Sequence, residues 1–292
     1  DSEARVSVTI PRGTSLQGIA RILQENDLIR DQWVFQLYTK FNDVDQKLQA
    51  GDYVIQKNLT NREMVELLQT GKSEETKVTI PEGSTIAQID EILAKKSLIE
   101  PGDFLQCANT CELSFSVEAL EGYMFPSTYF VSTSFSSQKF IERLYKEFQN
   151  QIEPLRVGIR DSERILDEIV IVASMIEREA ITPEEMPMIS DVIWKRLDEG
   201  MYLGIDATTR YEKNDWVNPL YTSDFEKDTP YNTRKNLGLP PTAISNPGIE
   251  AIKAAISPEE TEYYYYLHGT DGQIRFGKTI DEHNENKRKY LY

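Results

Sequence analysis

A pattern of apolar and polar positions occurs twice in the first hundred residues. Residues 8–13 read VTIPRG, and residues 78–83 read VTIPEG. Each copy predicts a short strand, a Pro-x-Gly turn and a helix. Two copies are too few for a solenoid, so the pattern indicates duplication of a small αβ unit. The apolar positions that match between the copies are Ile19, Ile22, Leu23, Leu28 and Ile29 in the first, and Ile89, Ile92, Leu93, Leu98 and Ile99 in the second.

The remaining elements predict an α+β fold. Residues 51–55 read as a strand and residues 61–70 as a helix closed by Gly71. From about Glu121 onward the chain has more aromatic residues and clearer helix ends, which predicts three segments, 1–75, 76–118 and 119–292. Two helices are expected next, one from Asp161 or Ser162 to about Ala180 and one after the Thr182–Glu185 capping box that stops at Gly200. A third helix is expected from Asn246-Pro247 to before Pro258. The chain then predicts a hairpin of residues 263–267 and 274–276 around Asp271-Gly272, and a last helix capped by Thr279 and Glu282.

Composition excludes few classes of protein but disfavours one. The 292 residues are 39% hydrophobic and 27% charged, which is typical of a folded chain of about two domains. The net charge of -16 repels phosphate backbones, so we expect no nucleic-acid partner. No apolar run reaches the roughly 20 residues that span a bilayer. The chain begins at Asp1 without an initiator Met, which leaves open a membrane anchor N-terminal to it.

The two cysteines, Cys107 and Cys111, lie four positions apart. This spacing brings them close on one helical turn, where an oxidising compartment permits a disulfide, while the alternative is two unpaired small apolar residues. Both readings stay open. A structural zinc ion needs four ligands, and neither His268 nor His283 lies near the cysteines in sequence, so we expect no metal site and no cofactor.

Glu177 is the main catalytic candidate. Leu166, Val170, Ala173 and Glu177 fall on one helical stripe that is apolar until it reaches the carboxyl group. Burial at such an edge raises the pKa and keeps the group protonated, as a general acid requires. Glu179 lies about 200° further around the helix, outside that environment. The alternative is a structural glutamate at a helix end, turned to solvent or paired with a nearby Lys or Arg.

Other polar groups cluster in segments that read as loops, at residues 204–209, 230–233 and 244–248. Their amides, hydroxyls and aromatic rings suit sugar hydroxyls and N-acetyl groups, although the same residue types are common in ordinary turns. One His on each of two elements supports no nucleophilic triad, and His283 is interpreted as structural. The run of tyrosines from Tyr263 to Tyr266 fits strand packing better than a stacking platform.

Several motifs in order resemble one family. They are EGYMFP with Thr128-Tyr129, ASMIERE at the end of the predicted catalytic helix, residues 203–208, PYNT, GLPP, ISNPG, Phe276 and Glu282-His283-Asn284. Together they resemble the YceG-like family of endolytic murein transglycosylases over nearly the whole chain. The resemblance implies a duplicated LysM-like αβ module at the N-terminus, within residues 1–75 with the second repeat in 76–118, followed by a mixed α/β catalytic domain at 119–292.

The resemblance implies a lytic transglycosylase that cuts peptidoglycan strands between N-acetylmuramic acid and N-acetylglucosamine. The family's catalytic glutamate falls on Glu177, which would act first as acid and then as base. The resemblance also implies an N-terminal membrane anchor, an extracytoplasmic catalytic part, and work alongside peptidoglycan synthases. The expected substrate-binding residues are Glu121, Tyr129, Asp206, Thr208, Tyr231, Asn232, Thr233, Ser245 and Asn246.

One departure and two alternatives qualify this interpretation. Ala207 stands where the family often has Pro, which puts the shape of the loop after Asp206 in doubt. A lysozyme-type hydrolase would use Asp206 to assist Glu177, with water as the nucleophile. A non-catalytic peptidoglycan-binding scaffold would keep its affinity whatever residue occupies position 177.

Overall fold

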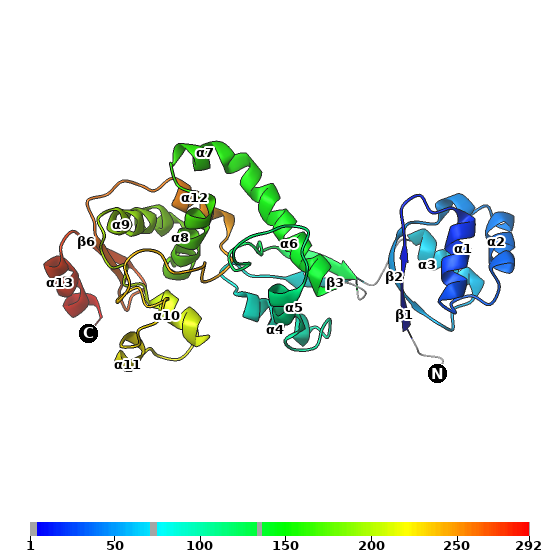
Figure 1. Cartoon of the computed structure of the whole chain (residues 1–292), viewed down its shortest axis with the longest axis horizontal. Helices are drawn as coiled ribbons and strands as arrows, with labels where there is room; N and C mark the ends of the chain where they lie inside the picture. Colours follow the sequence, from blue (N-terminus) through cyan, green and yellow to red (C-terminus); the bar gives the residue numbers. More distant parts are fainter. Residues whose placement is uncertain (1–4, 71–74, 133–135, 292) are drawn as a thin grey trace. The chain divides into compact units, whose positions relative to one another are not determined.

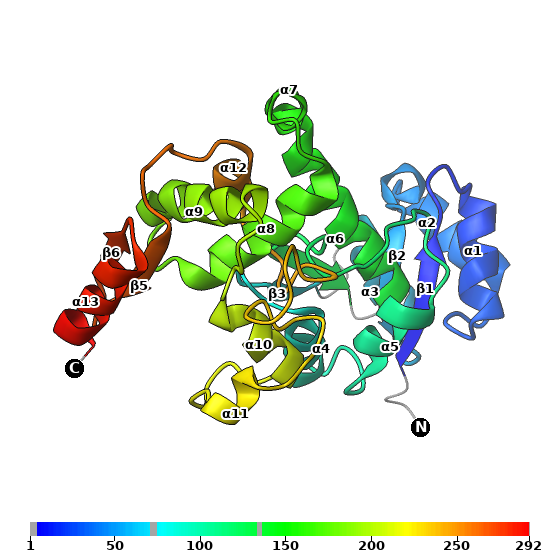
Figure 2. The ribbon, with the colours of Figure 1, turned by 60° about the vertical axis from the view of Figure 1, so that its left-hand side comes forward.

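The computed structural model describes residues 5–70, 75–132 and 136–291. The chain divides into two compact units: unit 1 comprises residues 1–79 and 128–136, and unit 2 comprises residues 80–127 and 137–292. Both are drawn in Figure 1 and, from another direction, in Figure 2. Within the described residues the architecture is mixed α/β, with many helices and three two-stranded antiparallel sheets. The finer division at residues 75 and 118 stays a prediction.

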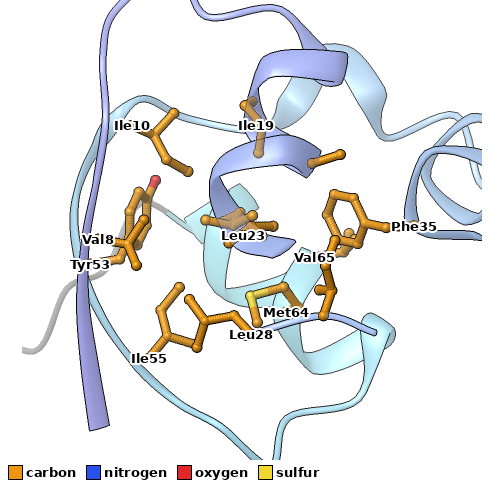
Figure 3. Packing of buried hydrophobic residues seen from close by; sticks show 13 residues of the cluster. Val8, Ile10, Ile19, Leu23, Leu28, Phe35, Tyr53, Ile55, Met64 and Val65 are labelled. Carbon is orange, nitrogen blue, oxygen red and sulfur yellow. The ribbon is translucent and has the colours of Figure 1, made fainter. Parts of the chain in front are cut away.

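Unit 1 is built around the β1–β2 pair, whose inner face packs against helices. Val8 of β1 lies opposite Tyr53 of β2, and both are buried together with Ile10 and Ile55. Figure 3 shows these side chains meeting Leu23 and other apolar side chains of the helices. A second antiparallel pair, β3–β4, belongs to the same unit. The elements are β1 (Arg5–Ile10), α1 (Leu16–Glu25), α2 (Gln32–Phe41), η1 (Asp45–Lys47), β2 (Gly51–Gln56), α3 (Asn61–Thr70), β3 (Glu75–Thr79) and β4 (Thr128–Ser132).

The predicted strand, turn and helix occur in both copies of the repeated motif. β1 leads through Gly13 to α1, and β3 leads through Gly83 to α4, with both glycines at positive φ as the turn requires. The strands pair with different partners, β2 and β4, and the second copy has its strand in unit 1 and its helix in unit 2. The predicted strand at 51–55 and helix at 61–70 are confirmed, while Gly71 lies outside the described residues.

Unit 2 is centred on α8, α9 and α12, which pack against one another (Figure 1). Ile176, Ile189 and Ile252, one from each helix, are fully buried. The elements of unit 2 are α4 (Ile86–Lys95), α5 (Asp103–Thr110), α6 (Ser137–Ile152), η2 (Glu153–Leu155), α7 (Arg156–Asp161), α8 (Leu166–Glu179), η3 (Pro183–Glu185), α9 (Met186–Asp198), α10 (Asp206–Lys213), α11 (Thr222–Phe225), α12 (Ile249–Ile256), β5 (Tyr265–His268), β6 (Ile274–Gly277) and α13 (Ile280–Tyr290).

Two predicted boundaries are corrected by the structure. The helix expected from Asp161 or Ser162 begins instead at Leu166, because Glu163 adopts φ 57° and breaks the backbone between α7 and α8. Residues 206–209 form the first turn of α10 rather than a loop. Asp206 there places a negative charge at the positive end of the helix dipole, which favours that start.

Most of the predicted helix ends and connections are confirmed. Thr182 and Glu185 form the capping box before α9, the Gly200 that follows α9 has φ 66°, and Thr279 accepts a hydrogen bond from the Glu282 N–H. The hairpin forms as β5–β6, and the helix expected after Asn246-Pro247 begins at Ile249. Cys107 and Cys111 form a disulfide, which decides between the two readings of the sequence. Within the described residues, no helix has the length and apolarity to cross a bilayer.

Replacing Gly122 with alanine is expected to destabilise unit 2 by about 3 kcal/mol, through backbone strain and overpacking. Gly122 has φ 96°, and an added Cβ would lie 2.6 Å from the Ala243 Cβ and 2.6 Å from a Val170 methyl group. Gly102 is a matched control, because it has the same φ of 96° and no atom within 4 Å of the added Cβ. Gly102→Ala should cost only about 1 kcal/mol. Equal losses in the two variants, measured by denaturant unfolding, would contradict the packing argument.

Candidate functional site

The apolar stripe of α8 ends at Glu177, as predicted. Val170 and Ala173 are buried, and Glu177 is half-buried at the end of the stripe. Its Oε2 accepts a hydrogen bond from the Gly248 N–H at 3.0 Å. Burial raises the pKa of Glu177 to about 7, the charge of Glu82 adds to the rise, and the Gly248 N–H and Arg178 oppose it. Glu177 is therefore a desolvated carboxyl group, as the sequence pattern indicated.

Glu177 and its neighbour Arg178 are also packed closely against the backbone. A Cβ added to Gly83 would lie 3.4 Å from the Glu177 Cγ and 3.3 Å from Arg178. The Arg178 Nη1 donates to the Gly83 carbonyl at 3.2 Å, and the guanidinium lies 3.5 Å from the centre of the Trp216 ring. Together with the bond between Glu177 and the Gly248 N–H, these contacts join the end of α8 to the turn before α4, to the segment after α10 and to the start of α12.

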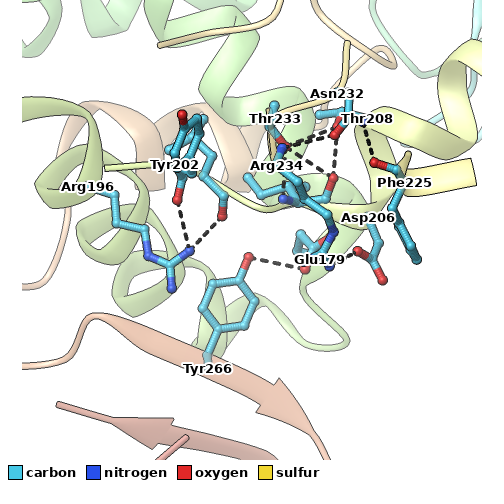
Figure 4. Close-up of polar contacts among 12 residues, drawn as sticks. Glu179, Arg196, Tyr202, Asp206, Thr208, Phe225, Asn232, Thr233, Arg234 and Tyr266 are labelled. Carbon is cyan, nitrogen blue, oxygen red and sulfur yellow. Dashed lines mark hydrogen bonds and ion pairs between the residues drawn. The ribbon is translucent and has the colours of Figure 1, made fainter. Parts of the chain in front are cut away.

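Glu179, two residues further on, lies in a different environment that is also desolvated. The Tyr266 hydroxyl donates to its Oε2 at 3.1 Å, and the Ala207 N–H donates to the same carboxyl group. Burial raises the pKa of Glu179, and the charge of Asp206 adds to the rise, whereas the two hydrogen bonds and His268 oppose it. Burial is thus not confined to Glu177. Figure 4 shows Tyr266 reaching from β5 towards Glu179, which faces α10.

Glu179 opens onto a cavity of about 470 Å³. Pockets that hold small ligands have volumes of about 300 to 1,000 Å³, and this cavity falls within that range. It can therefore hold part of a sugar chain. Its wall mixes aromatic rings with charged groups, a combination that suits a sugar chain. The polar and aromatic side chains that line the cavity with Glu179 are Arg196, Tyr202, Asp206, Arg234, Tyr265, Tyr266, His268, His283 and Lys287.

Two arginines shape the wall of this cavity. Arg234 forms an ion pair with Asp206, and its guanidinium lies 4.6 Å from the centre of the Phe225 ring. Arg196 of α9 donates from Nε to the Tyr264 carbonyl and from Nη1 to the Leu203 carbonyl, each at 2.6 Å. Burial lowers the pKa of Arg196, but an arginine stays charged near neutral pH. Asp206 is therefore held beside Glu179 by a charged partner (Figure 4).

Three expected substrate-binding residues form a buried network beneath α10. The Thr233 Oγ1 accepts from the Ile205 N–H at 3.0 Å and lies 3.3 Å from the Thr208 Oγ1. The Asn232 Nδ2 donates to the carbonyls of Phe225 and Lys227. Because these polar groups already have protein partners, the network fixes the backbone that presents Asp206 and Arg234 to the cavity.

Four more expected residues gather around a second network, on the other side of α8. Glu121 accepts hydrogen bonds from the Ile86 N–H and from the Asn246 Nδ2, and the Ser245 Oγ donates to the Ser174 carbonyl. Glu121 and Tyr231 line a separate cavity of about 800 Å³. The last expected residue, Tyr129, is buried in β4 of unit 1, opposite Val78.

Of the predicted site residues, the structure therefore brings only Asp206, with Thr208 and Thr233 behind it, to the Glu179 cavity. The cavity residues that the sequence did not predict as site residues include Glu179, Arg196, Arg234, Tyr266 and His283. Two signals were present: Glu179 lies within the ASMIERE motif, and Tyr266 ends the tyrosine run in a strand beside it.

The stability of unit 2 is expected to fall as the pH rises towards 8. Burial raises the pKa of Glu121 from 4.5 to about 8, so the folded state holds a proton that the unfolded state releases. The contribution is complete below about pH 4.5 and is lost as the pH rises through the folded pKa. Glu121→Gln removes this titration, so between about pH 4.5 and pH 8 the variant should lose on the order of 5 kcal/mol less stability than the parent. Equal slopes of unfolding free energy against pH in parent and variant would contradict the assignment.

The chain is similar to known proteins over nearly its whole length. The model of the YceG-like family matches residues 8–289. The chain is 31% identical over 311 residues to an endolytic murein transglycosylase of Bacillus subtilis, covering 100% of this chain and 86% of that protein. A Streptococcus pneumoniae protein of the same name is 24% identical, and the match spans 59% of its length.

Structural similarity agrees with the match in sequence. The crystal structure of a putative YceG-like protein from Listeria monocytogenes superposes with a TM-score of 0.66 at 31% identity. The alignment covers 97% of this chain and 99% of that one. With the family's match extending from the first strand to the last helix, the chain belongs to the YceG-like family.

Proposed function

We propose that this protein is an endolytic lytic transglycosylase of peptidoglycan. It cleaves the β-1,4 bond between N-acetylmuramic acid and N-acetylglucosamine and leaves a 1,6-anhydro end. The observation that carries the proposal is the desolvated carboxyl group of Glu179 in a cavity lined by aromatic and charged side chains. The names of the relatives from Bacillus subtilis and Streptococcus pneumoniae support the same activity.

One carboxyl group performs both proton transfers in turn. In its protonated form it donates to the glycosidic oxygen, and the bond from that oxygen to C1 of the muramic acid breaks. The resulting carboxylate then takes the proton of the 6-hydroxyl group of the same muramic acid, and the 6-oxygen bonds to C1. The carboxyl group regains its proton, the released strand carries the hydroxyl group, and no water is consumed.

Glu179 is the better-placed of the two glutamates for this work. Its carboxyl lines the cavity, and its pKa is raised by burial, as a general acid needs. Glu177, which the sequence motif favours, also has a raised pKa, but its carboxyl accepts a hydrogen bond from the Gly248 N–H and it does not line this cavity. We therefore assign the acid/base to Glu179 and carry Glu177 into the test as the alternative.

The remaining site residues position the carboxyl group and the substrate. Tyr266 orients the Glu179 carboxyl through its hydrogen bond, and the nearby charge of Asp206 raises the pKa of Glu179. Thr208 and Thr233 hold the segment that carries Asp206, and Asn232 braces the segment that carries Arg234. We propose that Glu121, Tyr231, Ser245 and Asn246 stabilise the wall of the second cavity, and that Tyr129 packs in the core of unit 1.

Membership of the family supports three further proposals, on the repeated motif, the membrane anchor and the partner enzymes. We propose that the repeated strand–turn–helix motif is a LysM-like module that holds the glycan. We propose further that a membrane anchor precedes this chain, that the catalytic unit lies outside the cytoplasm, and that the enzyme releases nascent strands beside peptidoglycan synthases. Supporting the first of these proposals, both copies form a strand, a glycine turn at positive φ and a helix.

The test is the chemical form of the products. Purified peptidoglycan strands are incubated with the protein, and the fragments are read by mass spectrometry. Internal fragments with anhydro ends are expected. Fragments heavier by one water would indicate a lysozyme-type hydrolase with Asp206 assisting. Strand binding without any fragments would indicate a non-catalytic scaffold.

A further inference from the structure

The Glu179 cavity is cationic in a strongly acidic chain. The chain carries a net charge of -16. Yet the side chains that line the cavity include three cations, Arg196, Arg234 and Lys287, against the acids Asp206 and Glu179. Burial raises the pKa of Glu179 and so disfavours its charged form. Even when both acids are counted as charged, three cations against two acids leave the wall with an excess of positive charge.

Two of the cations have no acidic partner among the residues that the structure describes. Arg234 is paired with Asp206. Arg196 uses Nε and Nη1 on backbone carbonyls and packs 4.7 Å from the centre of the Tyr265 ring, which leaves its Nη2 without a hydrogen bond within the described chain. A partly buried guanidinium without a carboxylate is a costly arrangement that an anionic ligand would relieve.

Lys287 approaches the same space from α13. It lies one helical turn after His283, on the same face of the helix, and both side chains line the cavity. Burial lowers the pKa of His283 to about 4, and the charges of Lys287, Arg196 and Arg234 add to that effect. All three cations therefore lie within electrostatic reach of one imidazole, which stays neutral at physiological pH.

We infer that Arg196 and Lys287 form a carboxylate subsite beside Glu179. The inference rests on the proposed function for the identity of the substrate, since a peptidoglycan strand carries carboxylates and a plain N-acetylglucosamine polymer carries none. A guanidinium with a free Nη2 and a mobile ammonium suit an oxygen anion. The subsite lets the enzyme recognise the muramic side of the scissile bond by charge.

The carboxylate has two sources on the strand. A muramic residue without a stem peptide exposes its lactyl carboxylate, whereas an intact stem masks that group as an amide and offers its own peptide carboxylates. Three disaccharides separate these sources: N-acetylglucosaminyl-N-acetylmuramic acid, the same disaccharide with its stem peptide, and diacetylchitobiose. None contains the N-acetylmuramic acid–N-acetylglucosamine bond, so binding is measured without cleavage.

The experiment measures the dissociation constants of the three ligands by titration calorimetry. The variants are Lys287→Met, Arg196→Lys and Lys289→Met. Lys289 is the matched control, because it lies on the same helix, is exposed and does not line the cavity. We expect Lys287→Met to weaken binding of a carboxylate ligand about threefold to fivefold, and Arg196→Lys about tenfold, with chitobiose unaffected.

The outcomes separate this inference from the proposed function. Preference for the bare muramyl disaccharide over chitobiose, lost in Lys287→Met and kept in Lys289→Met, supports a lactyl subsite. The same loss seen only with the stem-bearing ligand supports a peptide carboxylate. Equal binding of all three ligands, or equal losses in the two lysine variants, overturns the subsite even if anhydro products form. Carboxylate preference without any anhydro product upholds the subsite and rejects the transglycosylase.

Discussion

Glu179→Gln is expected to lower the release of anhydro-ended fragments by about a thousandfold, within the range that general acid–base catalysis contributes. The glutamine amide can still accept the hydrogen bond from the Tyr266 hydroxyl, but it can neither give a proton to the glycosidic oxygen nor take one from the 6-hydroxyl. Folding should survive, because glutamine is nearly isosteric and removes a titratable group that burial disfavours in its charged form. Fragment release is quantified by mass spectrometry, with thermal unfolding measured on the same samples.

Glu177→Gln is the matched control, because it makes the same chemical change one helix face away. Its amide oxygen can still accept from the Gly248 N–H, so we expect activity within about tenfold of the parent. The reverse result, with Glu177→Gln inactive and Glu179→Gln active, would return the acid/base to the position that the sequence motif indicated. Loss of activity in both variants with folding intact would mean that the two carboxyl groups act together.

The elements of the fold that the sequence predicted well are those with signals a few residues long. The Thr182–Glu185 capping box, the Thr279 cap and the glycine after α9 each close a helix end with atoms from one turn, so local chemistry suffices. The predicted start of α8 is wrong because Glu163 adopts a left-handed backbone conformation. A glycine at this position would have indicated that conformation, and a glutamate does not. The α10 start was missed because Gly204, Asp206 and two threonines resemble a loop.

The site was harder to predict because its environment is made by distant segments. The stripe on α8 correctly predicted a desolvated Glu177, since helical phase depends on the helix alone. The burial of Glu179 depends on Tyr266, 87 positions later in the chain, and on the start of α10. No spacing within α8 carries that information. For the same reason the sequence assigned the tyrosine run to strand packing, although one member points at the carboxyl group.

Asn246→Ala is expected to destabilise unit 2 by about 4 kcal/mol, since two buried N–H groups lose their acceptor. The Asn246 Oδ1 accepts from the Gly122 N–H at 2.9 Å and from the Met124 N–H at 2.8 Å. Its Nδ2 donates to the Ser84 carbonyl at 2.8 Å and to the Glu121 Oε1 at 2.9 Å. One fully buried amide thus joins three segments that are far apart in the sequence, and alanine replaces none of these bonds.

The measurement is guanidinium unfolding followed by tryptophan fluorescence in a Trp33→Phe background. Of the three tryptophans in the chain, Trp194 and Trp216 lie in unit 2, so the remaining signal reports on that unit alone. Asn150→Ala is the control, because Asn150 is exposed on α6 and its loss should change the unfolding free energy by no more than about 0.5 kcal/mol. A loss in Asn246→Ala as small as that of the control would show that the amide does not hold these segments. Destabilisation with anhydro-ended fragments still formed at low temperature would place Asn246 in the fold and outside the chemistry.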